Sequence, residues 1–555
     1  MNTVLALGGA VLPDSALSDS ALSVFALSDS GGAFPLLAVF GLCVVCTLLL
    51  SIGSILPEKD ELSGFYLGQR RLPSAVNGLA IFGSYMSAAG MLGNPGLIAL
   101  TGYDGIAYVL APMVAWSVLV LLVAEPYHSA SRFTIGDSLA LRLHARPAHL
   151  AAGVTSVVVC LLYLTAQLVG AGALAATVLG IDGDGAQRIV VAGLGLLMVL
   201  YVVIGGMRAA TLVQGVKAVA LLAAGLFVVL AVMSEFGWSP ARLLDAAVRQ
   251  SGFGDAFLEP GIRFHDRTSK MDSLSLQLAF VLGAAALPHV LMRIGTVSSG
   301  RRARRSAGWA ACLVIVFTLF EVVTGLGSAA LIGSRTIASD AASGNTAVLL
   351  LAERLGGPVL LTVVACVAFV TIVAVVAALT LTAAAALAHD VYGATIMRGN
   401  ASEKSELTVA RWGVGLIGVA AIALSMLAQH LNIAFLVSLA FAIAASAILP
   451  ALLCNLWWKG FTTRGAVWSM YGGLLVAVVL TALSPAVSGN ATALLPDADF
   501  AVFPLRNPGL LSIPVGFLLA WAGSVLDRRR HGGGADYTEM EIRVLTGSAS
   551  GRGGS

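Results

Sequence analysis

Two apolar stretches of this chain are interrupted near the middle by polar and helix-breaking residues, a pattern that could bind a small solute. The first reads SYMSAAGMLGNPG over residues 84–96, and the second reads LGAAALPHVLMR over residues 282–293. A helix that breaks inside a bilayer frees backbone N–H and C=O groups, which is tolerated only where they face protein or a water-filled cavity. Half-helix ends of this kind hold the charged groups of transported solutes. The pattern predicts a solute site at the two breaks.

The residues around the breaks favour a small apolar anion. Asn94 precedes Pro95 and so disfavours helix, while Gly90, Gly93 and Gly96 allow the backbone to approach a ligand closely. Exposed amides at a half-helix N-terminus can bind a carboxylate without Lys or Arg, and neither residue type lies near the middle of either span. The predicted substrate-binding residues are Tyr85, Met86, Ser87, Gly90, Met91, Gln167, Leu287 and Pro288. For each one, close helix packing is the alternative explanation.

Two titratable residues inside apolar spans are candidates for proton coupling. Glu321, in VFTLFEVVTGLG, lies near the middle of a span, where an ionised group is expensive and is by default a functional hypothesis. The alternative is a neutral Glu bonded to a neighbouring helix. His289 follows Pro288 and can titrate near neutral pH. Its alternative role is structural, through contact with a carbonyl that the proline frees.

The composition indicates what must position these residues. Hydrophobic residues make up 58% of the chain and charged residues 11%, whereas soluble domains contain roughly 25% charged residues. Each apolar stretch is near or above the roughly 20 residues that a membrane-spanning helix needs. The stretches cover residues 34–55, 75–101, 105–125, 148–179, 186–205, 209–235, 273–294, 307–333, 358–388, 408–428, 431–455, 464–484 and 508–526. The sequence predicts an all-α polytopic membrane protein with about 13 transmembrane helices.

The positions of the breaks predict five-plus-five inverted repeats. The second span enters the membrane from one side and the seventh from the other, as inversion requires. Arginines at 301, 302, 304 and 305 follow the seventh span, while the short loop 101–105 has no basic residue, which predicts an outer N-terminus and a cytoplasmic C-terminus. The predicted parts are a mobile outer tail (1–33), a peripheral first helix (34–55), the first repeat (75–235), the second repeat (273–455), two peripheral helices (464–526) and a cytoplasmic tail (527–555).

Other functional classes fit the sequence less well. The eight His residues are scattered and no metal-spacing motif such as HExxH occurs, so we expect neither an enzyme, nor a cofactor, nor a metal site beyond one for Na⁺. A channel or a substrate sensor is the alternative within membrane proteins. The basic clusters lie beside apolar spans, which favours a topological role over nucleic-acid binding. The expected partners are a small carboxylate and the lipid bilayer, and the protein is expected to act as a monomer.

Several segments taken together resemble a known family. They are GFYLGQRRLPSAVNGLAIFGSYMSAAGMLGNPGLIALTGYDG, VIGGMRAATLVQGVKA, ALPHVLMR, ASEKSELTVARWGVG, FAIAASAILPALL, FTTRGAV and NPGLLSIPVGF. Over roughly residues 36–526 the chain resembles the sodium:solute symporter family, in particular its acetate and short-chain monocarboxylate branch. The resemblance implies cation-driven uptake of acetate, propionate or pyruvate across the cytoplasmic membrane by alternating access. A sodium symporter for another small solute, such as proline, is the alternative.

The resemblance also implies where a coupling cation would bind. Sodium-coupled members use backbone carbonyls of the first broken helix together with carbonyl and hydroxyl groups of the helix that matches 358–388. The matching positions here are Gly83, Met86, Thr371, Ala374 and Val375. The last two replace hydroxyl-bearing residues, and Tyr85 and Gln214 stand where family members can carry Asp. The coupling ion is therefore predicted as Na⁺ or H⁺, with H⁺ preferred.

Overall fold

The computed structural model gives helices and short turns for the residues that it describes, and no named strand is present among them. The described residues are 73–179, 184–340, 344–428, 433–489, 493–495, 497–527 and 533–546. Within them, nine helices are long and apolar enough to cross a membrane, and a bent pair forms a tenth. This is the multi-pass, all-α architecture that the composition predicted. The predicted tail 1–33 and first span 34–55 lie outside the described residues.

The first predicted break is present. Helix α4 (Ser74–Tyr85) ends where Met86 turns extended, with φ −65° and ψ 124°. A π-helical turn, η2 (Ala89–Gly93), then leads into α5 (Asn94–Thr101), which has a proline in its first turn. The two halves of this span meet at 70°. The bend lies at the extended residue Met86, and Pro95 occupies the first turn of α5, where its missing N–H costs no helical hydrogen bond.

The next helices complete the first half of the bundle. They are α6 (Tyr103–Val118), η3 (Leu119–Val123), α7 (Ala124–Ala130), α8 (Ile135–Ala140), α9 (Ala145–Leu179) and α10 (Asp184–Glu235). A straight α10 would measure about 78 Å, far more than a bilayer. Along α10, Val191 packs on Gly172 of α9 and Val199 on Gly418, whereas Val232 packs on Gly327. The segment Val213–Glu235 of α10 is one of the candidate membrane spans and lies within the predicted span 209–235.

The second half contains the second break. Helix α12 (Arg267–Gly283) passes through a 3₁₀ turn, η5 (Ala284–Ala286), and the extended residue Leu287 before α13 (Pro288–Ile294) begins. The remaining elements of this half are α14 (Gly300–Leu331), α15 (Ser334–Asp340), α16 (Ala347–Ala385), η6 (Ala386–Ile396), α17 (Glu403–Leu427), α18 (Ile433–Ile443), η7 (Ala444–Ile448) and α19 (Leu449–Trp457). Helix α16 is kinked at Gly357, whose φ of +60° suits glycine.

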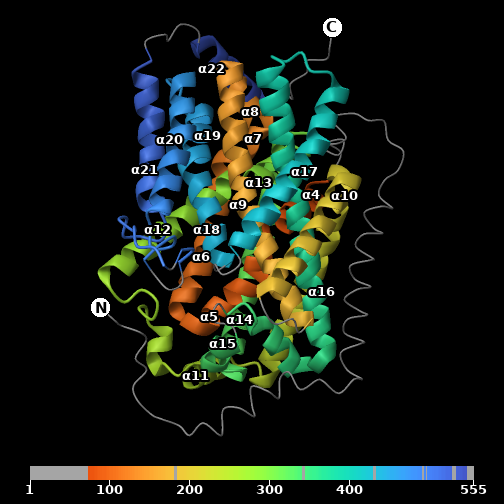
Figure 1. The fold of residues 1–555 in the computed structure, drawn as a ribbon, viewed down its shortest axis with the longest axis vertical. Coiled ribbons are helices and arrows are strands. Elements are labelled where there is room, and N and C mark those ends of the chain that lie inside the picture. The colour runs from red at the N-terminus through yellow and green to blue at the C-terminus, as the bar shows by residue number, and fades with distance from the viewer. Residues whose placement is uncertain are drawn as a thin grey trace.

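Helices outside the repeats border the core. Helices α20 (Thr463–Ala482) and α21 (Gly509–Val525) pack on each other and on η7. A helix that the sequence did not predict, α22 (Gly533–Thr546), lies within the tail 527–555 and packs on α7. In Figure 1, α8 and α22 lie at one end of the bundle, while α15 and α11 (Pro240–Ser251) lie at the other. These four helices lie in segments that connect or follow the predicted spans. Their separation agrees with the prediction that successive connecting segments lie on opposite sides of the membrane.

Candidate functional site

A central cavity of about 500 Å³ lies against the first break. Its wall is formed by the α4–η2 junction together with side chains from α5, α6, α9, α12, α14 and α18. The lining residues are Tyr85, Met86, Ser87, Ala89, Gly90, Asn94, Tyr108, Val109, Pro112, Tyr163, Phe280, Val314, Thr318, Glu321, Val437 and Phe441. No Lys, Arg or His is among them. Hydroxyl and amide groups are therefore the hydrogen-bond donors of the cavity, beside a large apolar surface.

Aromatic packing fixes the shape of the central cavity. The Phe441 ring lies between those of Phe280 and Tyr163, with centroids 4.9 and 5.9 Å away. The Tyr85 ring meets Phe441 at 6.4 Å and packs edge-on against Trp116 at 5.1 Å. Such edge-to-face pairs hold their rings in defined orientations. The cavity thus has mostly apolar walls with a few phenol and hydroxyl groups, and this lining can accommodate a short aliphatic chain that bears one polar head.

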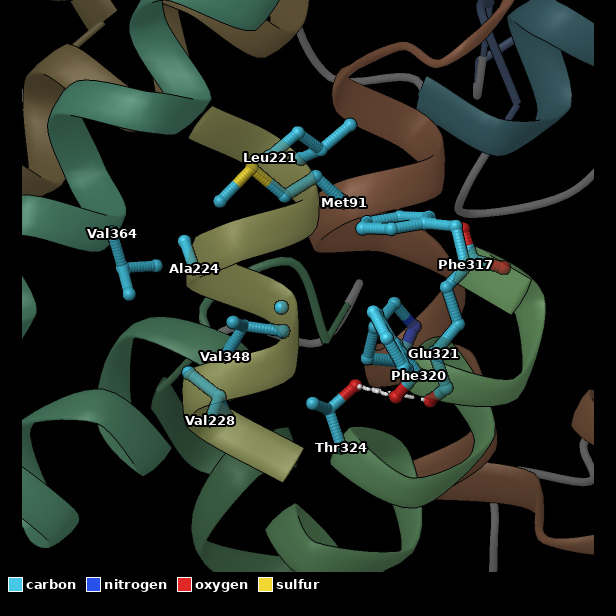
Figure 2. A pocket seen from close by; sticks show the side chains of 12 residues that line it. Met91, Leu221, Ala224, Val228, Phe317, Phe320, Glu321, Thr324, Val348 and Val364 are labelled. Atoms are coloured by element: carbon cyan, nitrogen blue, oxygen red, sulfur yellow. Dashed lines mark hydrogen bonds between the residues drawn. The ribbon is translucent and has the colours of Figure 1, made fainter. Parts of the chain in front are cut away.

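Glu321 is the residue that joins this cavity to a second one. It also lines a cavity of about 360 Å³ between α5, α10, α14 and α16, where the other side chains in Figure 2 are mostly apolar. Its Oε2 accepts a hydrogen bond from Asn94 Nδ2 at 3.2 Å. Its Oε1 is buried, has no hydrogen-bond partner among the described residues, and faces Gly90. The carboxyl group therefore has a free oxygen directed at the first break.

The structure separates the predicted substrate-binding residues into three groups. Tyr85, Met86, Ser87 and Gly90 line the central cavity, and Met91 lines the second cavity. The remaining three lie in neither lining. Gln167 Oε1 accepts a hydrogen bond from the Ala88 amide at 3.3 Å and so ties α9 to the first break. Leu287 and Pro288 are fully buried at the second break.

His289 packs against the cavity wall rather than lining it. Its ring lies edge-on to Tyr163 with centroids 5.5 Å apart. Neither ring nitrogen has a hydrogen-bond partner among the described residues. The alternative that His289 bonds to a carbonyl freed by Pro288 is therefore wrong.

The amino group of a lysine forms hydrogen bonds with two backbone carbonyl groups that were predicted as cation ligands. Lys217 of α10 is fully buried, and its Nζ donates hydrogen bonds to the carbonyl oxygens of Gly83, at 2.5 Å, and Met86. These carbonyls lie at the C-terminal end of α4, where the break removes intrahelical donors. Neither broken span has a Lys or Arg near its middle, as the sequence indicates. The predicted cation site nevertheless contains a basic residue, because α10, which lies outside both broken spans, supplies Lys217.

The α16 side of the predicted cation site is also filled from α10. Gln214 Nε2 donates to the Ala374 carbonyl at 3.4 Å, and Gln214 Oε1 accepts from Ser84 Oγ at 2.8 Å. Ala374 and Val375 are fully buried and offer no side-chain oxygen. Thr371 Oγ1 is buried without a partner among the described residues. Gln214 and Lys217 thus lie one turn apart and fill the space between α4 and α16.

A second set of charged groups lies at the α8 end of the bundle. Asp390 Oδ1 accepts from Thr134 Oγ1 at 2.7 Å and lies 2.7 Å from His149 Nδ1. His389 bridges Asp137 at 2.9 Å and Glu406 at 2.8 Å. Burial would raise the pKa of Asp137, but the neighbouring His389 outweighs it and holds that pKa well below its usual range. We call these six residues, Thr134, Asp137, His149, His389, Asp390 and Glu406, the polar cluster.

Comparison with known proteins agrees with this architecture. Residues 65–473 match the profile of the sodium:solute symporter family. The chain belongs to this family. It is 42% identical to a monocarboxylic acid transporter of Corynebacterium glutamicum over 91% of this chain and 93% of the relative, and 40% identical to the uncharacterized symporter YwcA of Bacillus subtilis over 92% and 97%. A Na⁺-coupled sialic acid symporter, solved in a substrate-bound outward-open state, superimposes with a TM-score of 0.65 at 14% identity, covering 88% of this chain and 98% of its own.

This symporter therefore has the five-plus-five inverted-repeat core with two broken helices. Membership of the family also makes it a cation-coupled symporter of small solutes. The feature that the sequence did not reveal is Lys217. One signal in the sequence could have indicated that Lys217 belongs to the site. It lies three residues after Gln214, a spacing that places both side chains on one face of a helix.

Proposed function

We propose that this symporter takes up acetate and related short-chain monocarboxylates, such as propionate and pyruvate, together with a proton. The observation that carries the proposal is Glu321, whose unpartnered Oε1 adjoins a cavity that is otherwise uncharged and mostly apolar. The similarity to a monocarboxylic acid transporter supports the substrate class. The phenol, hydroxyl and amide groups of the lining would orient the carboxylate, and the aromatic cage would enclose the alkyl chain.

Electrostatic repulsion between the carboxylate of the solute and that of Glu321 would couple solute binding to proton binding. Two carboxylates that share a poorly hydrated site do not both ionise readily, because like charges a few Å apart repel strongly there. A monocarboxylate anion in the central cavity would therefore favour a proton on Glu321, and the protonated group can donate a hydrogen bond. Anion and proton would then bind and leave together. The bends at the two breaks would let the halves of each broken helix move separately and open the cavity to alternate sides.

The proposal also includes an orientation in the membrane and an oligomeric state. We place the N-terminus outside and the C-terminus in the cytoplasm, in the cytoplasmic membrane, on the basic-residue bias of the loops. A single chain encloses both cavities, so we expect a monomer to carry out transport.

A second candidate is symport of a small amino acid. Glu321 lines the cavity, and its carboxylate could pair with the ammonium group of an amino acid. Counterflow of labelled acetate in proteoliposomes separates the candidates, because labelled acetate accumulates only when the unlabelled solute inside uses the same binding site. We expect propionate and pyruvate to compete and proline and glucose not to compete. Strong inhibition by proline with none by propionate would support the amino-acid assignment and refute ours.

The role of Glu321 is tested by Glu321→Gln, which mimics the neutral acid. We expect acetate exchange to continue, because exchange needs no net proton movement, while accumulation falls by on the order of tenfold or more. The matched control is Glu353→Gln, a glutamate of α16 that lines neither cavity. Full accumulation by Glu321→Gln would remove Glu321 from the coupling mechanism.

A further inference from the structure

Lys217 is held in a site that has the chemistry of a cation site. Helix α4 ends at Tyr85, so its last carbonyls lack intrahelical donors and carry the partial negative charge of a helix C-terminus. The ammonium group donates to two of the carbonyls around the break, those of Gly83 and Met86. Its side chain is fully buried between α10 and the first broken helix. A protonated lysine in this position is a compact positive charge held by neutral oxygens.

The charge of Lys217 has no direct counter-ion in the described part of the chain. No carboxylate lies within ion-pair distance of it there. Among the titratable groups of the neighbouring elements, His289 of α13 interacts electrostatically with Lys217 and with Arg293. On α16 the facing groups are uncharged. Backbone carbonyls therefore provide its main stabilisation, as they would for a bound metal cation.

Two cations cannot share this position. The Gly83 and Met86 carbonyls are the ones that the family resemblance assigns to a sodium ion, and an ammonium nitrogen 2.5 Å from one of them fills that space. A sodium ion in contact with the same oxygens would lie next to a fixed positive charge in a medium that screens poorly. On the α16 side, Gln214 engages the Ala374 carbonyl and Val375 has no oxygen in its side chain, so Thr371 Oγ1 is the one unpartnered side-chain oxygen among the predicted ligands there.

We infer that Lys217 is a tethered cation that takes the structural place of sodium between α4 and α16, and that this site does not bind Na⁺. The inference deepens the proposed function, since it names what occupies the cation site of a cation-coupled symporter. A dissociable ion stabilises the conformation to which it binds, and this stabilisation is lost when the ion leaves. A tethered ammonium group cannot leave, so its contribution to the stability of a conformation changes only when its side chain or α10 moves relative to the first break. Lys217 is thus a positioning residue for the Met86 segment of the central cavity.

Thermal unfolding of the purified full chain tests the inference without any substrate. A ligand that binds only the folded state raises its stability, so sodium binding should raise Tm in NaCl over choline chloride at equal ionic strength. We expect no sodium-specific rise for the wild type. Lys217→Ser removes the charge and leaves the two carbonyls beside a hydroxyl, and we expect it to acquire a saturable, sodium-specific rise in Tm. Lys404→Ser, at an exposed lysine of α17, is the matched control and should acquire none.

Two results would overturn the inference. One is a saturable sodium-specific rise in Tm for the wild type, and the other is a folded Lys217→Ser protein that does not respond to sodium. If Lys217→Ser does not fold, initial acetate uptake by the wild type decides: a change of less than about fivefold between sodium and choline supports the inference, and a larger increase with sodium overturns it. Because the Tm readout involves no solute, a wrong substrate assignment would leave it unaffected.

Discussion

The central cavity and the polar cluster hold their ionisable groups in opposite ways. In the cluster each acid meets a histidine or a hydroxyl within 3 Å. Around the cavity, Glu321 leaves one oxygen without a partner, and the hydrogen bonds of Lys217 Nζ among the described residues go to the carbonyls of Gly83 and Met86. Buried polar groups without partners are costly, so they persist where function requires them. We therefore propose that the cavity serves transport and that the polar cluster serves stability.

The largest effect on transport is expected at Ser87, a buried residue of the cavity wall. Ser87→Trp would fill the space that the solute and the first break share, so we expect loss of acetate uptake at unchanged membrane abundance. Ser87→Ala, which adds no volume, should retain uptake. Uptake in proteoliposomes with matched protein content is the measurement. Normal uptake by Ser87→Trp would place the solute elsewhere.

A comparable change in the polar cluster should affect stability instead. Gly136 and Gly153 leave room for Asp390, which accepts from Thr134 and pairs with His149. Removing one partner of a buried pair typically costs about 3–5 kcal/mol. We therefore expect Asp390→Ala to lower the free energy of unfolding by about that amount in SDS titrations, while each folded molecule still transports acetate.

The exposed Asp245 of α11 supplies the control, since Asp245→Ala should change stability little. Loss of transport by fully stable Asp390→Ala would give the polar cluster a direct part in transport and end the contrast between the two regions.

The smallest effect concerns acid sensitivity. The folded-state pKa of Asp137 lies well below its usual range, so its contribution to stability is present above the unfolded pKa of about 3.9 and is lost as pH falls through the folded value. We expect the Tm of the wild type to decrease below about pH 4, and Asp137→Asn to reduce that decrease. Melting curves from pH 6 to pH 3 measure it. An equal decrease in both proteins would assign the acid sensitivity to other carboxylates.

The breaks were predictable because their signals are local. Pro95, Pro288 and the glycines around them interrupt apolar runs, and the chain departs from the α-helix at both places. Glu321 was predictable for a related reason, since a lone carboxylate in an apolar span is conspicuous. The predicted helix boundaries followed from the length and apolarity of each stretch.

The partners of these residues were not predictable, because they depend on how distant helices cross. His149 and Asp390 are 241 residues apart in sequence and meet only in the fold. Lys217 lies in the first part of the predicted span 209–235, where the long side chain of a lysine usually extends toward the membrane surface. Only the packing of α10 against α4 turns its side chain onto Gly83 and Met86.

Accumulation of labelled acetate in proteoliposomes, with proton and sodium gradients imposed one at a time, tests the central claim most directly. The claim is that a proton handled by Glu321 drives transport, with Lys217 in place of sodium. We predict accumulation under an inward proton gradient in choline medium, above the passive entry of acetic acid into protein-free liposomes at the same pH. We predict none under an inward sodium gradient alone. Accumulation that follows the sodium gradient and is unaffected by collapse of the proton gradient would contradict the claim.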